Sequence, residues 1–244
     1  MNRILFEKCE IADGVATCGG ARAEHIVSVL HGEVGQILKT GVVDGPIGTG
    51  EIVEIAKAGG GTVVRVKVRH DSKSLEPWCD LILAPPRPRV MKRLLPQLAS
   101  LGVGSIVLVG AKKVEKDFWG ATLLKEENYR PLLVDGLMQA GTSVLPRLET
   151  WRNFRKFLSD EMDAMFPTKN RVVAHPYVDS ASAGDVAGDR LLLAVGPEGG
   201  WTDEEVALLE SHGFAHYSLG PRILRTDTAL IALLAQLMPL FERA

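Results

Sequence analysis

Several short runs in the later part of the sequence are apolar at nearly every position, among them residues 105–110, 171–176 and 190–196. A strand with one face in water alternates apolar and polar side chains, whereas a continuously apolar strand is buried on both faces. Segments with helical spacing of apolar residues, such as 91–101, lie between these runs. The alternation predicts an α/β fold in which helices cover a parallel sheet.

Residues before about position 70 follow a different pattern, with strand-type runs separated by turn-forming residues and one helix near 21–30. The strand-type runs are 36–39, 50–55 and 62–68. This pattern is typical of a small β-barrel. Because a polar stretch precedes the next apolar run, we predict two domains: a β-barrel at 1–73 and the α/β domain at 74–244.

Within the second domain, the sequence predicts further helices at about 119–137, 151–165 and 227–241. The small and polar residues 180–188 are expected to form a surface loop. The last of these helices is apolar nearly all round, and such a helix must be covered. A second subunit or a deep groove of the same chain would serve as the cover.

Composition excludes several classes of protein. Hydrophobic residues make up 46% of the chain, enough for a sizeable core, but no run has the length and apolar character to cross a membrane. The three cysteines, Cys9, Cys18 and Cys79, lack the spacing of disulfides or of metal ligands, and the histidines form no metal-binding pair. We therefore expect a cytoplasmic protein without a metal site and without a membrane partner.

The net charge of −2 does not by itself indicate a nucleic-acid partner. Basic residues nevertheless outnumber acidic ones between positions 87 and 125, and a local basic face binds phosphate even on an acidic protein. The basic residues are Arg87, Arg89, Lys92, Arg93, Lys112, Lys113, Lys116 and Lys125. On composition alone, an ordinary solvated surface explains them equally well.

The first candidate site is the glycine-rich stretch 196–200, which follows an apolar strand and precedes a helix. Thr202 and Glu205 form a capping box that starts this helix. Glycines at the carboxyl end of a parallel strand let a ligand approach the backbone. A plain turn would need fewer glycines, and the spacing differs from both the dinucleotide and the triphosphate fingerprints.

The second candidate site, residues 216–229, repeats this arrangement: a short strand runs into Gly220 and Pro221, and a helix follows with Thr226 as its expected N-cap. Arg222 and Arg225 beside a glycine-rich turn indicate a nearby anion or a developing negative charge. Surface ion pairs are the alternative role for either arginine.

Together, the stretches 196–200 and 219–229 resemble the signature of the RsmE family, which methylates N3 of a uridine in small-subunit (16S) ribosomal RNA and belongs to the SPOUT superfamily. Weaker matches lie at Arg3 and Phe6, and at 25–30, 101–103 and 175–176. The resemblance implies a PUA-like β-barrel that binds RNA, followed by an α/β domain with a parallel sheet and a deep trefoil knot. It also implies a homodimer with the final helix at the interface.

The resemblance further implies a site for S-adenosylmethionine formed by both loops, mainly through their backbone. The expected cofactor residues are Val195, Gly196, Pro197, Glu198, Gly199, Gly200, Leu219, Gly220, Ile223, Leu224, Arg225 and Thr226. The expected RNA-binding residues are Arg3, His25, Arg87, Arg89, Lys92 and Arg222. For catalysis, we expect Arg225 to stabilise the charge that develops on the uridine, and Glu198 or Asp227 to orient the base.

Several positions depart from the family pattern, namely His31, Ser100, Asp227 and residues 137–142. Most of them belong to the part of the pattern that faces RNA, so the methyl donor is more firmly indicated than the target nucleotide. One alternative is an RsmE-like RNA- or ribosome-binding protein with an altered target or without catalysis. Others are a Rossmann-type nucleotide enzyme and a methyltransferase acting on ribose or on transfer RNA.

Overall fold

The computed structural model describes residues 3–176 and 190–241, so the predicted surface loop at 180–188 lies outside the described residues. The chain forms two compact units. The first contains Met1–Leu75 and Val134–Leu145, and the second contains Glu76–Leu133 and Pro146–Ala244. The division at residue 75 lies close to the predicted boundary at 73. The segment Val134–Leu145, however, belongs to the first unit although it falls within the predicted domain 74–244.

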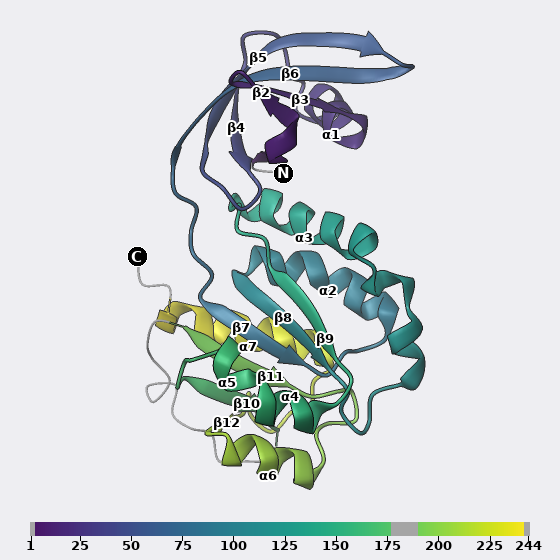
Figure 1. Ribbon diagram of the computed structural model, residues 1–244, viewed down its shortest axis with the longest axis vertical. Coiled ribbons are helices and arrows are strands. Elements are labelled where there is room, and N and C mark those ends of the chain that lie inside the picture. Colours follow the sequence, from purple (N-terminus) through teal and green to yellow (C-terminus); the bar gives the residue numbers. More distant parts are fainter. Residues whose placement is uncertain (1–2, 177–189, 242–244) are drawn as a thin grey trace. The chain divides into compact units, whose positions relative to one another are not determined.

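The first unit contains a six-stranded mixed sheet, in which β5 and β6 form a long hairpin (Figure 1). Neighbouring strands are antiparallel except for β1 and β4, which are parallel. The order of the strands is β1 (Ile4–Phe6), β4 (Ile37–Val42), β5 (Ile47–Ala58), β6 (Gly61–Ser72), β3 (Val15–Gly19) and β2 (Ile11–Ala12). The predicted helix is present as α1 (Gly20–Glu24), which continues as a π-helix over His25–Val29.

Alternation along β6 shows why this sheet has one buried face. Val64 and Val66 are fully buried, whereas Arg65 and Lys67 between and after them are exposed. Phe6 and Ile26 of the same unit are also fully buried. The strand-type run 62–68 is therefore confirmed as a strand, with the period of two that a half-buried strand requires.

Hydrogen bonds attach Val134–Leu145 to the first unit. The backbone amide of Arg3 donates to the carbonyl of Met138 (3.1 Å), and the amide of Asp44 donates to the carbonyl of Ser143 (2.8 Å). The hydroxyl of Ser143 donates to the carbonyl of Gly45 (2.6 Å). These partners lie about a hundred residues away along the chain, so the local sequence pattern does not reveal them.

The second unit contains a six-stranded sheet in which every neighbouring pair is parallel. The order of the strands is β12 (Ala215–Tyr217), β10 (Arg171–Ala174), β11 (Leu191–Val195), β7 (Cys79–Leu83), β8 (Val103–Val109) and β9 (Arg147–Trp151). All residues of the two central strands, β7 and β11, are buried. The predicted parallel sheet is therefore confirmed.

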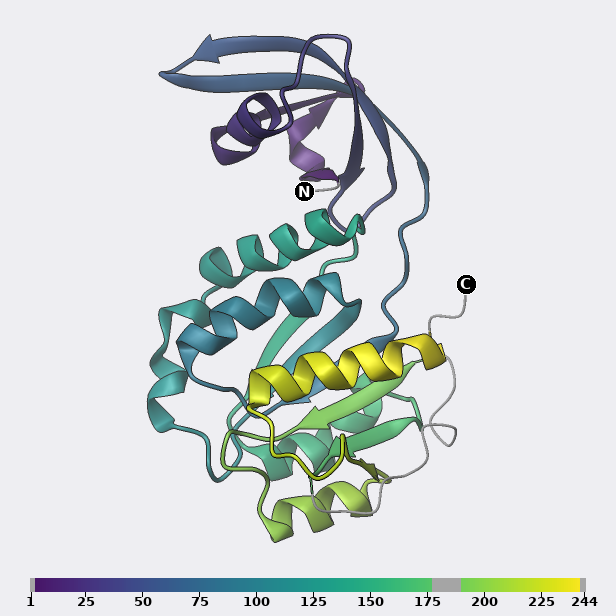
Figure 2. The same cartoon turned by 180° about the vertical axis from the view of Figure 1, so that it is seen from behind.

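Helices cover both faces of this sheet (Figures 1 and 2). On one face, α2 (Pro88–Ser100) and α7 (Thr226–Phe241) contact each other. On the other face lie α4 (Phe154–Asp160), α5 (Met162–Met165) and α6 (Asp203–Ser211). No helix in the described part of the chain has the length and hydropathy required to cross a lipid bilayer.

Two predicted helix boundaries are wrong. Trp151 ends strand β9, because Arg147–Trp151 pairs with β8. Helix α4 begins only at Phe154. Asn153 caps this helix, since its side chain accepts a hydrogen bond from the amide of Lys156 (3.0 Å). The helix predicted from residue 119 begins instead at Glu126 as α3 (Glu126–Ala140), after the short 3-10 turns Lys116–Gly120 and Thr122–Leu124.

Candidate functional site

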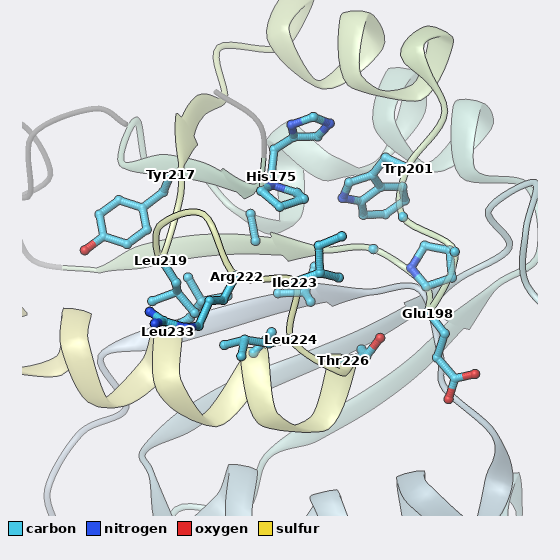
Figure 3. Close-up of a pocket in the computed structure, with 18 of the residues that line it drawn as sticks. His175, Glu198, Trp201, Tyr217, Leu219, Arg222, Ile223, Leu224, Thr226 and Leu233 are labelled. Carbon is cyan, nitrogen blue, oxygen red and sulfur yellow. The ribbon is translucent and has the colours of Figure 1, made fainter. Parts of the chain in front are cut away.

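A cavity of about 450 Å³ lies in the second unit, beside the carboxyl ends of β10, β11 and β12 (Figure 3). Ligands of open parallel sheets bind at this edge, because the loops that leave the strands converge there. The predicted cofactor residues line the cavity with the single exception of Arg225. They are Val195, Gly196, Pro197, Glu198, Gly199, Gly200, Leu219, Gly220, Ile223, Leu224 and Thr226.

The first turn needs glycine at two positions for two different reasons. Gly200 has φ of +69°, in the left-handed region that side chains disfavour. A Cβ atom on Gly196 would lie only 3.1 Å from the backbone nitrogen, Cδ1 and Nε1 of Trp201. The turn therefore brings its backbone close to the indole and leaves no room for a side chain between them.

Two hydrogen bonds tie this turn and the following helix to the loop after β8. The ammonium of Lys113 donates to the carbonyl of Gly199 (2.7 Å), and the amide of Lys112 donates to the carboxylate of Glu205 (2.7 Å). Glu205 also completes the capping box with Thr202, as predicted, by accepting from the Thr202 amide (2.9 Å). The loop after β8 thus holds both the glycine-rich turn, at Gly199, and the start of the following helix, at Glu205.

The second turn supplies an apolar wall. Gly220 has φ of +105°, and its amide donates to the hydroxyl of Ser218 (3.1 Å). Ile223 is 70% exposed and Leu224 is 37% exposed, although both line the cavity. Large exposed apolar side chains beside a cavity are suited to cover an apolar part of a ligand.

The cavity also has lining residues that were not predicted as site residues. Trp201 belongs to the first glycine-rich loop, where its place next to Gly200 was the available signal. Lys113 lies in the basic segment, and His175 lies directly after a strand. Burial lowers the pKa of His175, and the neighbouring His216 lowers it further. Burial also raises the pKa of Tyr217, another lining residue.

The three predicted catalytic residues have different surroundings in the structure. Glu198 lines the cavity, and Figure 3 shows its carboxylate pointing away from the middle of the group of lining residues. Arg225 is exposed and does not line the cavity. Asp227 lies outside the lining as well, because its carboxylate pairs with the guanidinium of Arg93 on α2 (3.3 Å). Their roles in catalysis stay predictions.

The predicted RNA-binding residues also differ in their surroundings. In the second unit, Arg89 and Lys92 are exposed at the start of α2. Arg87 forms an ion pair with Glu115 (3.0 Å). Arg222 lines the cavity. In the first unit, the other two are held within the fold, and their role in RNA binding stays a prediction. The guanidinium of Arg3 donates to the carbonyls of Thr40 (2.7 Å), Gly48 (3.0 Å) and Gly141 (2.9 Å). Nε2 of His25 is buried and has no hydrogen-bond partner among the described residues.

The chain is similar to known RNA methyltransferases over most of its length. The family model described as the RNA methyltransferase domain matches residues 74–238. The ribosomal RNA small subunit methyltransferase E of Treponema pallidum is 32% identical over 238 residues, which are 95% of this chain and 88% of that protein. The ribosomal RNA small subunit methyltransferase E 1 of Borreliella burgdorferi is 26% identical, with 95% of each protein covered.

A solved structure agrees over nearly the full length. A methyltransferase of Legionella pneumophila, in complex with its cofactor SAM, aligns with a TM-score of 0.75 at 26% identity and covers 97% of this chain and 96% of that one. The fold, the site and the family match define residues 74–238 as an RNA methyltransferase domain. The chain belongs to the family of the ribosomal RNA small subunit methyltransferases E, the RsmE family.

Proposed function

We propose that this protein transfers a methyl group from S-adenosylmethionine to N3 of a uridine in small-subunit ribosomal RNA. The observation that carries the proposal is the convergence of the two glycine-rich turns, 196–200 and 219–224, on one cavity at the carboxyl edge of a parallel sheet. Relatives named for methylation of small-subunit ribosomal RNA, at 32% and 26% identity over 95% of this chain, support the choice of substrate.

The residues of the cavity fit a bound S-adenosylmethionine. A volume of about 450 Å³ is within the range of small-molecule sites. Backbone groups at Gly196 and Gly220 are accessible because neither residue has a side chain, and Ile223 and Leu224 offer apolar surface. When bound, the cofactor supplies an electrophilic methyl group on a sulfonium. The protein residues hold and orient both reactants.

In the proposed reaction, a bond forms between the methyl carbon and N3 of uridine, the bond from carbon to sulfur breaks, and the N3 proton leaves to a base. Holding the two reactants in line supplies roughly 7–11 kcal/mol of barrier reduction in well-oriented cases. The uridine anion spreads its charge over the carbonyl oxygens beside N3. Arg225, an exposed cation next to the cavity-lining residues Leu224 and Thr226, is our candidate for stabilising that charge.

The finer architecture is also a proposal. We assign the first unit, with its mixed six-stranded sheet, as a PUA-like barrel that binds RNA, and the second unit as a trefoil-knotted SPOUT domain. We assign a homodimer in the cytoplasm, with α7 at the interface. Leu230, Leu233, Leu234 and Leu237 of α7 are buried within the chain, whereas Ile231 and Met238 are only half-buried and leave apolar surface for a second copy. The mass of the protein in solution, measured by light scattering, tests the dimer.

The experiment that tests the function is mass-spectrometric mapping of ribosomal RNA from cells that lack the protein. We expect one N3-methyluridine of the small-subunit RNA to disappear and to return when the gene is restored. An unchanged methylation map would contradict the proposal. A protein that binds ribosomal RNA without catalysis is the second candidate, motivated by the departures at His31 and Ser100. Such a protein would leave the map unchanged and need not bind S-adenosylmethionine.

A further inference from the structure

Trp201 has a buried hydrogen-bond donor that is left without a partner in the part of the chain that the structure describes. The residue is 6% exposed, and its indole nitrogen Nε1 has no hydrogen-bond partner among the described residues. Trp78, by contrast, is also buried, and its Nε1 donates to the carbonyl of Leu101 (2.7 Å). A buried N–H without a partner is unfavourable, and native structures contain few of them. The donor of Trp201 therefore calls for an acceptor that none of the described residues supplies.

The indole is held with its N–H edge toward the cavity. Its ring stacks on Phe154, with ring centres 5.1 Å apart and an angle of 18° between the planes. Atoms Cδ1 and Nε1 form the edge nearest Gly196, since both lie 3.1 Å from the position of a Cβ on that residue. Trp201 lines the cavity, and Figure 3 shows its nitrogen on the side facing the other lining residues. The donor therefore belongs to the wall of the cavity, beside the backbone of Gly196.

The surroundings of Trp201 favour an uncharged acceptor. The indole belongs to an apolar cluster that includes Phe154, Phe214 and Ala194. A carboxylate placed there would lose its hydration without gaining a cation, at a high free-energy cost. The cationic side chains that line the cavity are Lys113, whose ammonium is bound to the Gly199 carbonyl, and the exposed Arg222. Of the parts of S-adenosylmethionine, the nucleoside supplies neutral acceptors, whereas the amino-acid end carries the charged groups.

We infer that the indole N–H of Trp201 donates a hydrogen bond to the nucleoside part of the methyl donor, at a ring nitrogen or a ribose oxygen. The inference rests on the proposed function, because it names a residue that binds the proposed cofactor. It gives Trp201 a positioning role: the close approach of Gly196 and the stacking on Phe154 set the direction of the donor. Phenylalanine at position 201 would keep most of the apolar contact and lose this hydrogen bond.

The test is NMR spectroscopy of protein labelled with ¹⁵N-tryptophan. The chain has four tryptophans, and each gives one indole N–H signal. Trp201→Phe identifies the Trp201 signal by its loss. We expect S-adenosylhomocysteine and adenosine to shift this signal and methionine to leave it in place. The signal of Trp78 is the internal control, since its N–H is already bound to Leu101. The variant serves only to assign the signal, and the ligand titration itself uses the native side chain.

Affinity and stability give an independent readout. Trp201→Phe should weaken binding of S-adenosylhomocysteine about fivefold to tenfold, the effect of one neutral hydrogen bond. The melting temperature of the unliganded variant should change little, because removal of the buried unpartnered donor offsets part of the packing that the smaller ring loses. A merely structural role would instead lower the melting temperature together with the affinity. Trp151→Phe, at a half-buried tryptophan that does not line the cavity, is the matched control and should leave binding unchanged.

The possible results separate the inference from the proposed function. An unmoved Trp201 signal at saturating S-adenosylhomocysteine, or equal affinity of Trp201→Phe, would overturn the inference while the methyl-donor site stands. A shift with methionine and none with adenosine would overturn the assignment to the nucleoside. Failure of the native protein to bind S-adenosylhomocysteine at all would overturn both.

Discussion

The ammonium of Lys113 donates a hydrogen bond of 2.7 Å to the carbonyl oxygen of Gly199. This bond connects the loop after β8 to the glycine-rich turn after β11, two segments that lie 86 residues apart in the sequence. The turn lines the cavity, and its backbone is the part of the protein that we propose to bind the methyl donor. The position of a binding backbone is therefore controlled by a side chain from another loop.

Replacement of this lysine should loosen the turn. We expect Lys113→Met to weaken binding of S-adenosylmethionine by roughly threefold to tenfold, because it removes one charge-assisted hydrogen bond at a partly solvated position. Titration calorimetry measures the effect. Lys112→Met is the matched control, since Lys112 contributes its backbone amide to Glu205 and the substitution keeps that amide. Equal affinities of the two variants would show that Lys113 does not control the turn.

Gly196→Ala should disturb the cavity directly. The new Cβ would lie 3.1 Å from three atoms of Trp201, and the indole cannot move freely because it stacks on Phe154. We expect the free energy of unfolding to fall by about 1–3 kcal/mol, as for other overpacked sites, and the affinity for S-adenosylmethionine to fall more than tenfold. Denaturant titration and calorimetry measure the two effects.

Gly199→Ala is the control for this substitution. Its Cβ would meet the Cδ atom of Lys113 at 3.0 Å, but that atom belongs to a flexible exposed side chain that can shift. We expect a smaller loss of stability than for Gly196→Ala. If Gly196→Ala were as stable and bound as tightly as the native protein, the close approach of the turn to Trp201 would not matter for binding.

The parallel sheet could be predicted from the sequence, because its central strands are buried on both faces and are therefore apolar at nearly every position. Residues 191–195 are apolar throughout, and all are buried in β11. The two glycine-rich turns could be found for a similar reason, since positive φ and the close approach of Trp201 demand glycine at fixed positions. The capping box of Thr202 and Glu205 was equally visible, because it depends on residues three apart.

Features set by distant partners could not be predicted. Trp151 lies in a strand because Arg147–Trp151 pairs with β8, although its own neighbourhood indicated a helix. Val134–Leu145 joins the first unit through hydrogen bonds to Arg3, Asp44 and Gly45. Likewise, Lys113 and His175 reach the cavity only through the order of the strands, which the local pattern does not determine.

Arg225→Ala should separate chemistry from cofactor binding. Arg225 is exposed and does not line the cavity, so its loss should leave the affinity for S-adenosylmethionine within a few-fold of the native value. Methylation of ribosomal RNA should be abolished if the guanidinium stabilises the uridine anion. Transfer of a labelled methyl group measures activity, and calorimetry measures binding. Arg225→Lys keeps a positive charge and should retain part of the activity. A parallel loss of affinity and activity would make Arg225 a structural residue.

His175 should make the stability of the protein depend on pH. Burial and the nearby His216 lower the pKa of His175 below its ordinary value of 6.5. Above about pH 6.5, the side chain is neutral in the folded and unfolded states and has no effect. As the pH falls from 6.5 toward the lowered pKa, the unfolded state binds the proton more readily, so the free energy of unfolding decreases.

Urea unfolding at about pH 7.5 and about pH 5.5 measures this dependence. We expect His175→Asn to lose less stability between the two values than the native protein does. The half-buried His70 also has a lowered pKa, but it is present in both proteins, so the difference between them reports on the substitution of His175. Identical pH dependence in the two proteins would contradict the prediction.

The most direct test of the proposed methyl-donor site is titration of the purified native protein with S-adenosylmethionine in a calorimeter. We predict saturable binding of one ligand per chain, with a dissociation constant in the micromolar range, and a loss of that binding in Gly196→Ala. Absence of binding at millimolar ligand would contradict the assignment of this cavity to the methyl donor.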